Sequence, residues 1–237
     1  MELIPLVIGA AVFFIALAVI FAVVKGIMKI IFSVFSIIIV LSLVGGAFIA
    51  SDFMDLRENF PNEEKTMLLK DENKALAGSI IISLEDENPT LITQEQLDSY
   101  SGYLQEDNLK AILGDKYKLI IVDLGALREL EAETFNLGEE YSKEFLISVL
   151  ESDEPKSLFI EEYGEEPTMD ELELKAAVFG VMFGNIGPII LIDQYKKDNI
   201  IFYPETAVFK VMRYLPVSVF KDTMQGVMSK VEEKIPA

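Results

Sequence analysis

The amino-acid sequence predicts an α+β soluble domain carried on an N-terminal transmembrane helical hairpin. The first 50 residues hold two long uncharged stretches, whereas nearly all charged side chains of the 237-residue chain lie after them. Beyond residue 64, short β-type runs alternate with segments of helical periodicity. The chain therefore divides into a membrane anchor over residues 1–50, a polar stalk over 51–64 and an acidic domain over 65–237.

The anchor is predicted from the length of its two uncharged stretches, residues 3–24 and 30–50. Each is at least as long as the roughly 20 residues that a helix needs to cross the hydrocarbon core. The segment between them, Lys25 to Lys29, suits a tight connection at Gly26 with both lysines among the headgroups. A single helix through both stretches would be roughly twice as long as a membrane is thick. A cleaved signal peptide would have a basic start and a shorter apolar core than this sequence has, so we do not expect cleavage.

Small residues recur every four positions on both predicted spans. Such faces let two helices approach closely in lipid, although small residues are also common in membrane helices generally, and the pattern fits both interpretations equally. The predicted helix-packing residues are Ala18, Ala22, Gly26, Ser42, Gly46 and Ala50.

The charge pattern predicts a multi-pass cell-membrane protein whose soluble domain lies outside the cytoplasm. The two lysines at the hairpin tip favour a cytoplasmic tip, because basic residues accumulate on the inner side. Arg57, Lys65 and Lys70 follow the second span and favour the opposite orientation, although acidic residues lie between them.

Composition excludes several classes of chemistry. Residues 51–237 carry 18 basic and 38 acidic side chains, a net charge of −20, and such a field repels nucleic-acid phosphates. The chain has no histidine and no cysteine, which excludes histidine-based triads, cysteine nucleophiles and the common zinc and iron sites. Its acidic clusters lack the ligand pattern of a calcium loop. We therefore predict no catalytic residue, no cofactor and no metal ligand.

The first half of the domain reads as a hairpin, two helices and a strand. Turn-type residues 71–74 separate two apolar runs, and a capping box at Thr93 opens a helix. Asp107 is predicted to cap a second helix that ends at Gly114. The expected elements are strands 66–70 and 77–84, helices 94–104 and 108–113, and a buried strand over 118–122.

The second half mixes helices with short strands. Apolar residues at helical spacing predict a helix over 139–151, and a capping box at 168–171 opens another that runs through Phe183. Short β-type runs predict a strand over 157–160 and a hairpin of strands 189–192 and 200–203. The 17 uncharged residues 176–192 approach the length of a third span, but Pro188 and three glycines favour a buried helix, turn and strand.

An amphipathic helix is predicted over residues 217–235. From Pro204 onward the chain has five basic and four acidic residues, so this tail has a small positive net charge within a strongly negative domain. The tail could therefore lie on the membrane surface. Packing on the domain's own sheet is the commoner outcome for such a helix. The residues predicted to contact the membrane are Phe209, Lys210, Arg213, Tyr214 and Phe220.

Two short strings accompany the two-span start: Glu58-Asn59-Phe60-Pro61, and Tyr203-Pro204-Glu205-Thr206 before the basic-aromatic tail. This order of features resembles uncharacterised archaeal two-span membrane proteins. The resemblance implies a membrane setting and no particular activity or site.

The sequence thus predicts a membrane-anchored interaction or accessory protein. Its expected partners are the lipid bilayer and either another protein or a second copy of the chain, with no nucleic acid. Two alternatives stay open: a membrane-bound enzyme that uses carboxylates and a divalent ion, and an oligomeric channel subunit lined by Ser33, Ser36 and Ser42.

Overall fold

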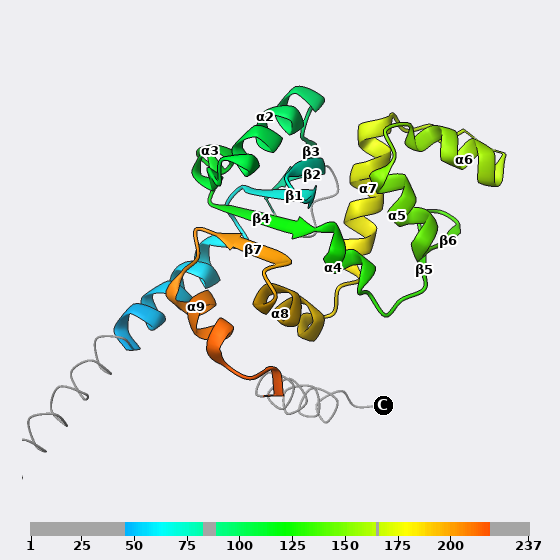
Figure 1. Cartoon of the computed structure of the whole chain (residues 1–237). Coiled ribbons are helices and arrows are strands. Elements are labelled where there is room, and N and C mark those ends of the chain that lie inside the picture. The colour runs from blue at the N-terminus through cyan, green and yellow to red at the C-terminus, as the bar shows by residue number, and fades with distance from the viewer. Residues whose placement is uncertain (1–45, 83–88, 165, 219–237) are drawn as a thin grey trace, which may run out of the picture. The chain divides into compact units, whose positions relative to one another are not determined.

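A computed structural model of the chain describes residues 46–82, 89–164 and 166–218 (Figure 1). The chain divides into two compact units, residues 1–51 and 52–237, and the described part of the second is a mixed domain of one main sheet and several helices. Most of the predicted hairpin, including Ala18, Ala22, Gly26 and Ser42, lies outside the described residues. So does the predicted helix 217–235, apart from its first two residues.

The main sheet has five strands in the order β3-β2-β1-β4-β7. β1 and β4 run parallel, and every other neighbouring pair is antiparallel. The parallel pair requires a crossover, which α2 and α3 provide. The strands are β1 Lys65–Asp71, β2 Lys74–Ile81, β3 Thr90–Leu91, β4 Lys118–Asp123 and β7 Ile200–Tyr203.

The hairpin of β1 and β2 confirms the predicted one and contains a β-bulge. Leu69 pairs with Ala77 and Lys70 with Ala75, so Leu76 is the extra residue. Gly78 lies at a close approach, because a Cβ atom there would meet the Met67 carbonyl oxygen at 2.7 Å. The hairpin therefore depends on a glycine within a buried strand.

One face of the sheet is covered by α2, Gln94–Gln105, and α3, Leu109–Leu113. The capping box at Thr93 is present as predicted, with Gln96 as the reciprocal partner. The cap of α3 is Asn108, not Asp107, whose backbone has a φ of +53°. A smaller core lies under these helices and contains Leu68, Ala75, Ile92, Leu97, Ile112, Leu119 and Ile121.

The larger core lies against the other face of the sheet, and α4 to α9 contribute side chains to it. Alternation along β1 divides the cores, since Met67 and Leu69 face this side while Leu68 faces the other. A two-stranded sheet of β5, Thr134–Asn136, and β6, Glu140–Ser142, precedes α5. The helices are α4 Leu124–Arg128, α5 Lys143–Glu151, α6 Pro155–Tyr163, α7 Glu171–Gly184, α8 Pro188–Lys196 and α9 Ala207–Tyr214.

Two predicted strands are wrong, and both follow a proline that starts a helix. Residues 157–160 lie in α6, which begins at Pro155 and is capped at its end by Gly164, with a φ of +75°. Residues 189–192 lie in α8, which begins at Pro188. Proline suits the first helical position, where its missing N–H costs nothing. The predicted hairpin of 189–192 with 200–203 is therefore wrong, and β7 pairs instead with β4.

Two predicted helix starts are shifted. The helix expected from residue 139 begins at Lys143, because residues 140–142 form β6 and Ser142 is the cap. The capping box of α7 uses Asp170 and Glu173 rather than Thr168 and Glu171.

The uncharged run 176–192 forms most of α7, a turn and the start of α8. Val178, Phe179 and Met182 from this run are buried in the larger core. Among the described residues, no single helix is long and apolar enough to cross a membrane, while α7 and α8, bent by 105°, meet the criteria of length and composition as a pair.

Candidate functional site

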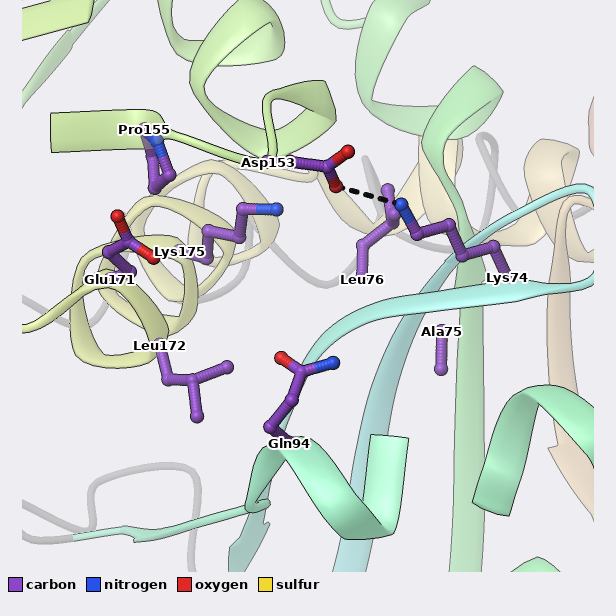
Figure 2. A pocket seen from close by; sticks show the side chains of 9 residues that line it. All are labelled: Lys74, Ala75, Leu76, Gln94, Asp153, Pro155, Glu171, Leu172 and Lys175. Carbon is purple, nitrogen blue, oxygen red and sulfur yellow. Dashed lines mark hydrogen bonds and ion pairs between the residues drawn. The ribbon is translucent and has the colours of Figure 1, made fainter. Parts of the chain in front are cut away.

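A small pocket lies where three helices begin, beside the first residues of β2 (Figure 2). Gln94 is the first residue of α2, Pro155 the first of α6, and Glu171 the first of α7. The pocket has a volume of about 90 Å³, and its remaining wall is made by Lys74, Ala75, Leu76, Asp153, Leu172 and Lys175. Helix starts carry a partial positive charge, but capping boxes occupy the starts of α2 and α7, and the pocket is lined by two lysines and two acidic residues.

The outer part of the pocket holds an ion pair. Lys74 Nζ donates to Asp153 Oδ1 at 3.0 Å, and both side chains are largely exposed. This hydrogen bond lowers the pKa of the Asp153 carboxyl. A pair this exposed contributes little to stability, but it leaves each of the two charges compensated by the other.

Lys175 is the unusual residue of the pocket, because only 8% of it is exposed. Its side chain extends from α7 toward the Lys74–Asp153 pair (Figure 2). The described part of the chain provides its ammonium with no hydrogen bond and no ion pair. Burial lowers the pKa of Lys175 and Lys74 lowers it further, against the opposite effect of Asp153 and Glu171. Among the described residues, the buried side-chain polar atom without a hydrogen-bond partner is Thr206 Oγ1 and not Lys175 Nζ.

A second, larger cavity of about 260 Å³ adjoins a group of aromatic rings. Tyr141, Phe159 and Tyr163 line it, and Phe145 completes the group with edge-to-face contacts to Phe159 and Tyr163. Aromatic rings packed in this way are common at the edge of a hydrophobic core. The packing of these rings therefore has a structural explanation.

Two carboxylates fasten the start of the domain to α9 and to the residue that precedes β4. The Asp52 carboxylate accepts from the Ala207 N–H at the start of α9, and Asp55 Oδ2 accepts from the Tyr117 hydroxyl at 2.7 Å. That hydrogen bond lowers the pKa of Asp55, while burial, together with the same bond, raises the pKa of Tyr117. Residues 52–59 are helical and are thus held at two points.

Two buried lysines complete this end of the sheet. Lys65 Nζ donates to the carbonyls of Phe60 and Glu63, both at 2.5 Å, and of Ile82. Lys118 Nζ donates to the Pro204 carbonyl at 2.8 Å. Burial lowers the pKa of both amines, and for Lys118 the carboxylates of Asp52 and Asp55 act in the opposite direction.

The residues predicted to contact a membrane separate into two groups on α9. Phe209 stacks on Phe202 with ring centroids 4.5 Å apart, and Arg213 pairs with Asp198 and Glu205 and lies over the Tyr195 ring. Lys210 and Tyr214 are exposed, Tyr214 to 85%. Phe220 lies outside the described residues.

Of the predicted helix-packing residues, the structure describes Gly46 and Ala50, which are helical and exposed. Neither contacts the pocket of Lys175. No residue of this pocket was among the predicted site residues. One signal was present: Lys175 occupies the buried stripe of α7 with Val178, Phe179 and Met182, at helical spacing.

The divalent-ion hypothesis receives no support from this part of the chain. Within residues 46–82, 89–164 and 166–218, no three acidic side chains come together in a way that could hold a metal ion. No protein-family model matches the chain, and neither a curated protein nor a solved structure is significantly similar to it.

Proposed function

We propose that the chain is a membrane-anchored interaction protein, with residues 1–50 in the bilayer and the acidic domain held at its surface to bind another protein or a second copy. One observation supports this best. Asp52, which bonds to the first N–H of α9, follows the end of the predicted second span by only two residues.

That spacing leaves almost no free chain between the predicted anchor and the domain. Asp52 and Asp55 are bonded to α9 and to Tyr117, and the Phe60 carbonyl is bonded to Lys65. A loose stalk would let the domain move away from the bilayer, whereas these bonds keep its first residues in the fold. If residues 30–50 cross the membrane, the domain lies against the headgroups.

Apolar side chains are exposed on the two elements that Asp52 joins. Phe53 and Met54 are 58% and 59% exposed, and Val211 and Tyr214 of α9 are 38% and 85% exposed. We call these four residues the entry face. Apolar and tyrosine side chains favour the boundary between headgroups and acyl chains, so the entry face is suited to contact lipid.

The rest of the domain is suited to a different partner. A net charge of −20 over residues 51–237 repels anionic lipids and attracts cationic protein surfaces. The proposal therefore assigns lipid contact to the entry face and protein contact to the acidic surface.

The absence of cysteine from the sequence allows a direct test of the entry face. Met54→Cys and Tyr214→Cys, each labelled with an environment-sensitive fluorophore, are reconstituted as full chains into phosphatidylcholine vesicles. Glu95→Cys at the start of α2 is the matched control. We expect blue-shifted emission and quenching by spin-labelled lipid at 54 and 214 but not at 95. Water-like emission at all three positions would refute lipid contact.

The interaction part of the proposal has its own test. The full chain is purified in mild detergent and its mass is measured under native conditions. We expect a stoichiometric second chain, identical or different. A monomer under conditions that preserve known membrane complexes would contradict the interaction role and leave the anchor unaffected.

A further inference from the structure

We propose that the cavity lined by Tyr141, Phe159 and Tyr163, here called the aromatic cavity, binds an arginine side chain of a partner protein. This site rests on the proposed function and deepens it, because it gives a location to the protein contact of the acidic surface. It depends neither on the anchor nor on the entry face. The cavity is built from β6, α6 and the segment that leads into α7, all within the described domain.

Three rings line the cavity in two orientations. The Tyr141 ring stands at 73° to the Phe159 ring and at 84° to the Tyr163 ring, with centroids 5.3 and 5.0 Å apart. Phe145, which is outside the lining, supports both rings of α6 through edge-to-face contacts at 4.8 and 5.0 Å. The rings are therefore held in place by one another, which reduces the entropy that is lost when a ligand binds.

Apolar side chains remain exposed at the cavity. Tyr163 and Met169, which line it, are 42% and 41% exposed, and Ile160, one turn before Tyr163 on α6, is 47% exposed. Phe159 and Leu174, which also line it, are buried. Exposed apolar groups gathered beside a hollow commonly mark a contact with another molecule. The aromatic cavity thus combines a buried apolar wall with an exposed one.

The surroundings of the cavity are negatively charged. Its lining contains the exposed acids Glu139 and Glu166 and, among the described residues, no lysine or arginine. Residues 139–166 carry ten acidic and two basic side chains. Glu166 accepts from Lys156 at 3.3 Å, but an exposed carboxylate has room for further donors. Ring faces and carboxylates both attract a cation, so the cavity favours a positively charged ligand.

Size and shape select an arginine side chain among the cations. The volume of about 260 Å³ lies below the roughly 300–1,000 Å³ of sites for drug-sized ligands and suits a single side chain. A guanidinium is planar and weakly hydrated, so it stacks on rings while its N–H groups pair with carboxylates, whereas a lysine ammonium is strongly hydrated. A second copy of the chain is a poor source, because two domains that each carry −20 over residues 51–237 repel each other.

Methionine-methyl NMR of the full chain in detergent tests the site. Met169 lines the cavity, and the exposed Met54 of the entry face is the matched control. Acetyl-arginine amide is titrated, with acetyl-citrulline amide as its uncharged analogue of nearly the same shape. We expect the arginine compound to shift the Met169 signal saturably, to leave Met54 unchanged, and to bind about tenfold more tightly than the citrulline compound. No saturable shift of Met169, or equal binding of both compounds, would overturn the proposal.

Two further experiments address other occupants. Glycerophosphocholine carries the quaternary ammonium of a lipid headgroup, and tighter binding of it than of acetyl-arginine amide would assign the cavity to lipid and overturn the proposal. We expect weaker binding, because Glu139 and Glu166 repel its phosphate. The chain is also diluted without ligand. We expect a constant Met169 signal, and a concentration-dependent shift would assign the cavity to a second copy and overturn the proposal.

Two variants and a control locate the site. Glu139→Gln preserves the size of an exposed side chain and removes its charge, so it should weaken binding of acetyl-arginine amide about threefold. Tyr163→Ala removes one ring and should weaken binding about fivefold. Glu106→Gln, exposed at the end of α2, is the control and should bind as the original chain does. Should Tyr163→Ala not fold, Glu139→Gln decides: weaker binding supports the site, and unchanged binding refutes it.

The site and the proposed function fail in different ways. If acetyl-arginine amide does not bind although the native mass shows a second chain, this site is wrong and the interaction role stands. If the compound binds beside Met169 although the chain is a monomer, the interaction role is wrong, and the assignment of the arginine to a partner protein fails with it.

Discussion

Lys65 and Lys118 are register partners at the first positions of the parallel strands β1 and β4, and both are buried, at 0% and 2% exposure. Two adjacent ammonium groups would repel each other. Each is compensated from a different part of the chain: Lys65 binds the carbonyls of Phe60, Glu63 and Ile82, and Lys118 binds that of Pro204. The pair thereby fastens the start of the domain and the segment before α9 to one end of the sheet.

Replacing either lysine with methionine should destabilise the domain. Lys118→Met leaves one carbonyl without its hydrogen-bond donor and should lower the free energy of unfolding by about 1.5 kcal/mol. Lys65→Met leaves three carbonyls without their donor and should lower it by about 3 kcal/mol. The measurement is denaturant unfolding followed by circular dichroism. Lys110→Met is the control and should change stability by less than about 0.5 kcal/mol. Equal effects of all three changes would contradict this role for the buried amines.

The Asp55–Tyr117 bond should hold residues 52–59 on the domain. Asp55→Ala and Tyr117→Phe are each expected to cost about 0.5–1 kcal/mol, and the double variant should cost less than their sum because both single changes remove the same bond. Hydrogen exchange of the amides of residues 52–59 is the measurement. Additive effects would show that the two side chains act independently.

Acid should weaken the same bond. The Tyr117 hydroxyl lowers the pKa of Asp55 in the folded state, so the bond contributes fully above the unfolded pKa of about 3.9. That contribution is lost as pH falls through the lower folded pKa. The protection factors of residues 52–59, which correct for the pH dependence of intrinsic amide exchange, should therefore fall below about pH 4 in the original chain. Asp55→Asn should not show this fall.

Tyr195 should make the domain sensitive to alkali. Burial, followed by its hydrogen bond to Glu205, raises the pKa of Tyr195 to about 12. A tyrosine with a raised pKa contributes stability that is complete below the unfolded value near 10 and is lost as pH rises through the folded value. Stability measured from pH 9 to 12 should fall less steeply in Tyr195→Phe than in the original chain. Parallel curves would contradict the shift.

Two glycines should respond to alanine in opposite directions. At Gly78 a Cβ would lie 2.6 Å from Ile92 Cδ1 and 2.7 Å from the Met67 carbonyl oxygen, whereas at Gly102 in α2 nothing lies within 4 Å. Gly78→Ala should therefore destabilise by about 2 kcal/mol, while Gly102→Ala should stabilise by about 0.5–1 kcal/mol. Thermal unfolding of both variants is the check, and a neutral Gly78→Ala would mean that the hairpin can relax.

Local sequence signals predicted the elements whose ends are marked by capping or turn residues. The capping box at Thr93, the turn after Asp71 and the apolar run after Lys118 produce the expected helix, hairpin and strand. The failures at 157–160 and 189–192 have one cause. Both are short apolar runs that fit strand or helix, and only the proline at the first helical position, Pro155 or Pro188, distinguishes them.

The candidate site could not be predicted, because tertiary packing assembles it. The pocket takes residues from four separate segments, namely Lys74, Gln94, Asp153 and Lys175. The packing that brings the starts of α2, α6 and α7 together leaves no local pattern in the sequence. Only Lys175 on the buried stripe of α7 was visible in the sequence. The pairing of β7 with β4 is likewise a long-range contact.

Residues 1–50 are proposed to anchor this domain in a membrane, and alkaline extraction tests this anchor most directly. Membranes from cells that express the full chain are washed with carbonate at high pH and centrifuged, and the intact mass of the protein is confirmed in each fraction. We expect the chain to stay in the pellet and to be released by detergent. An intact chain in the carbonate supernatant would contradict it.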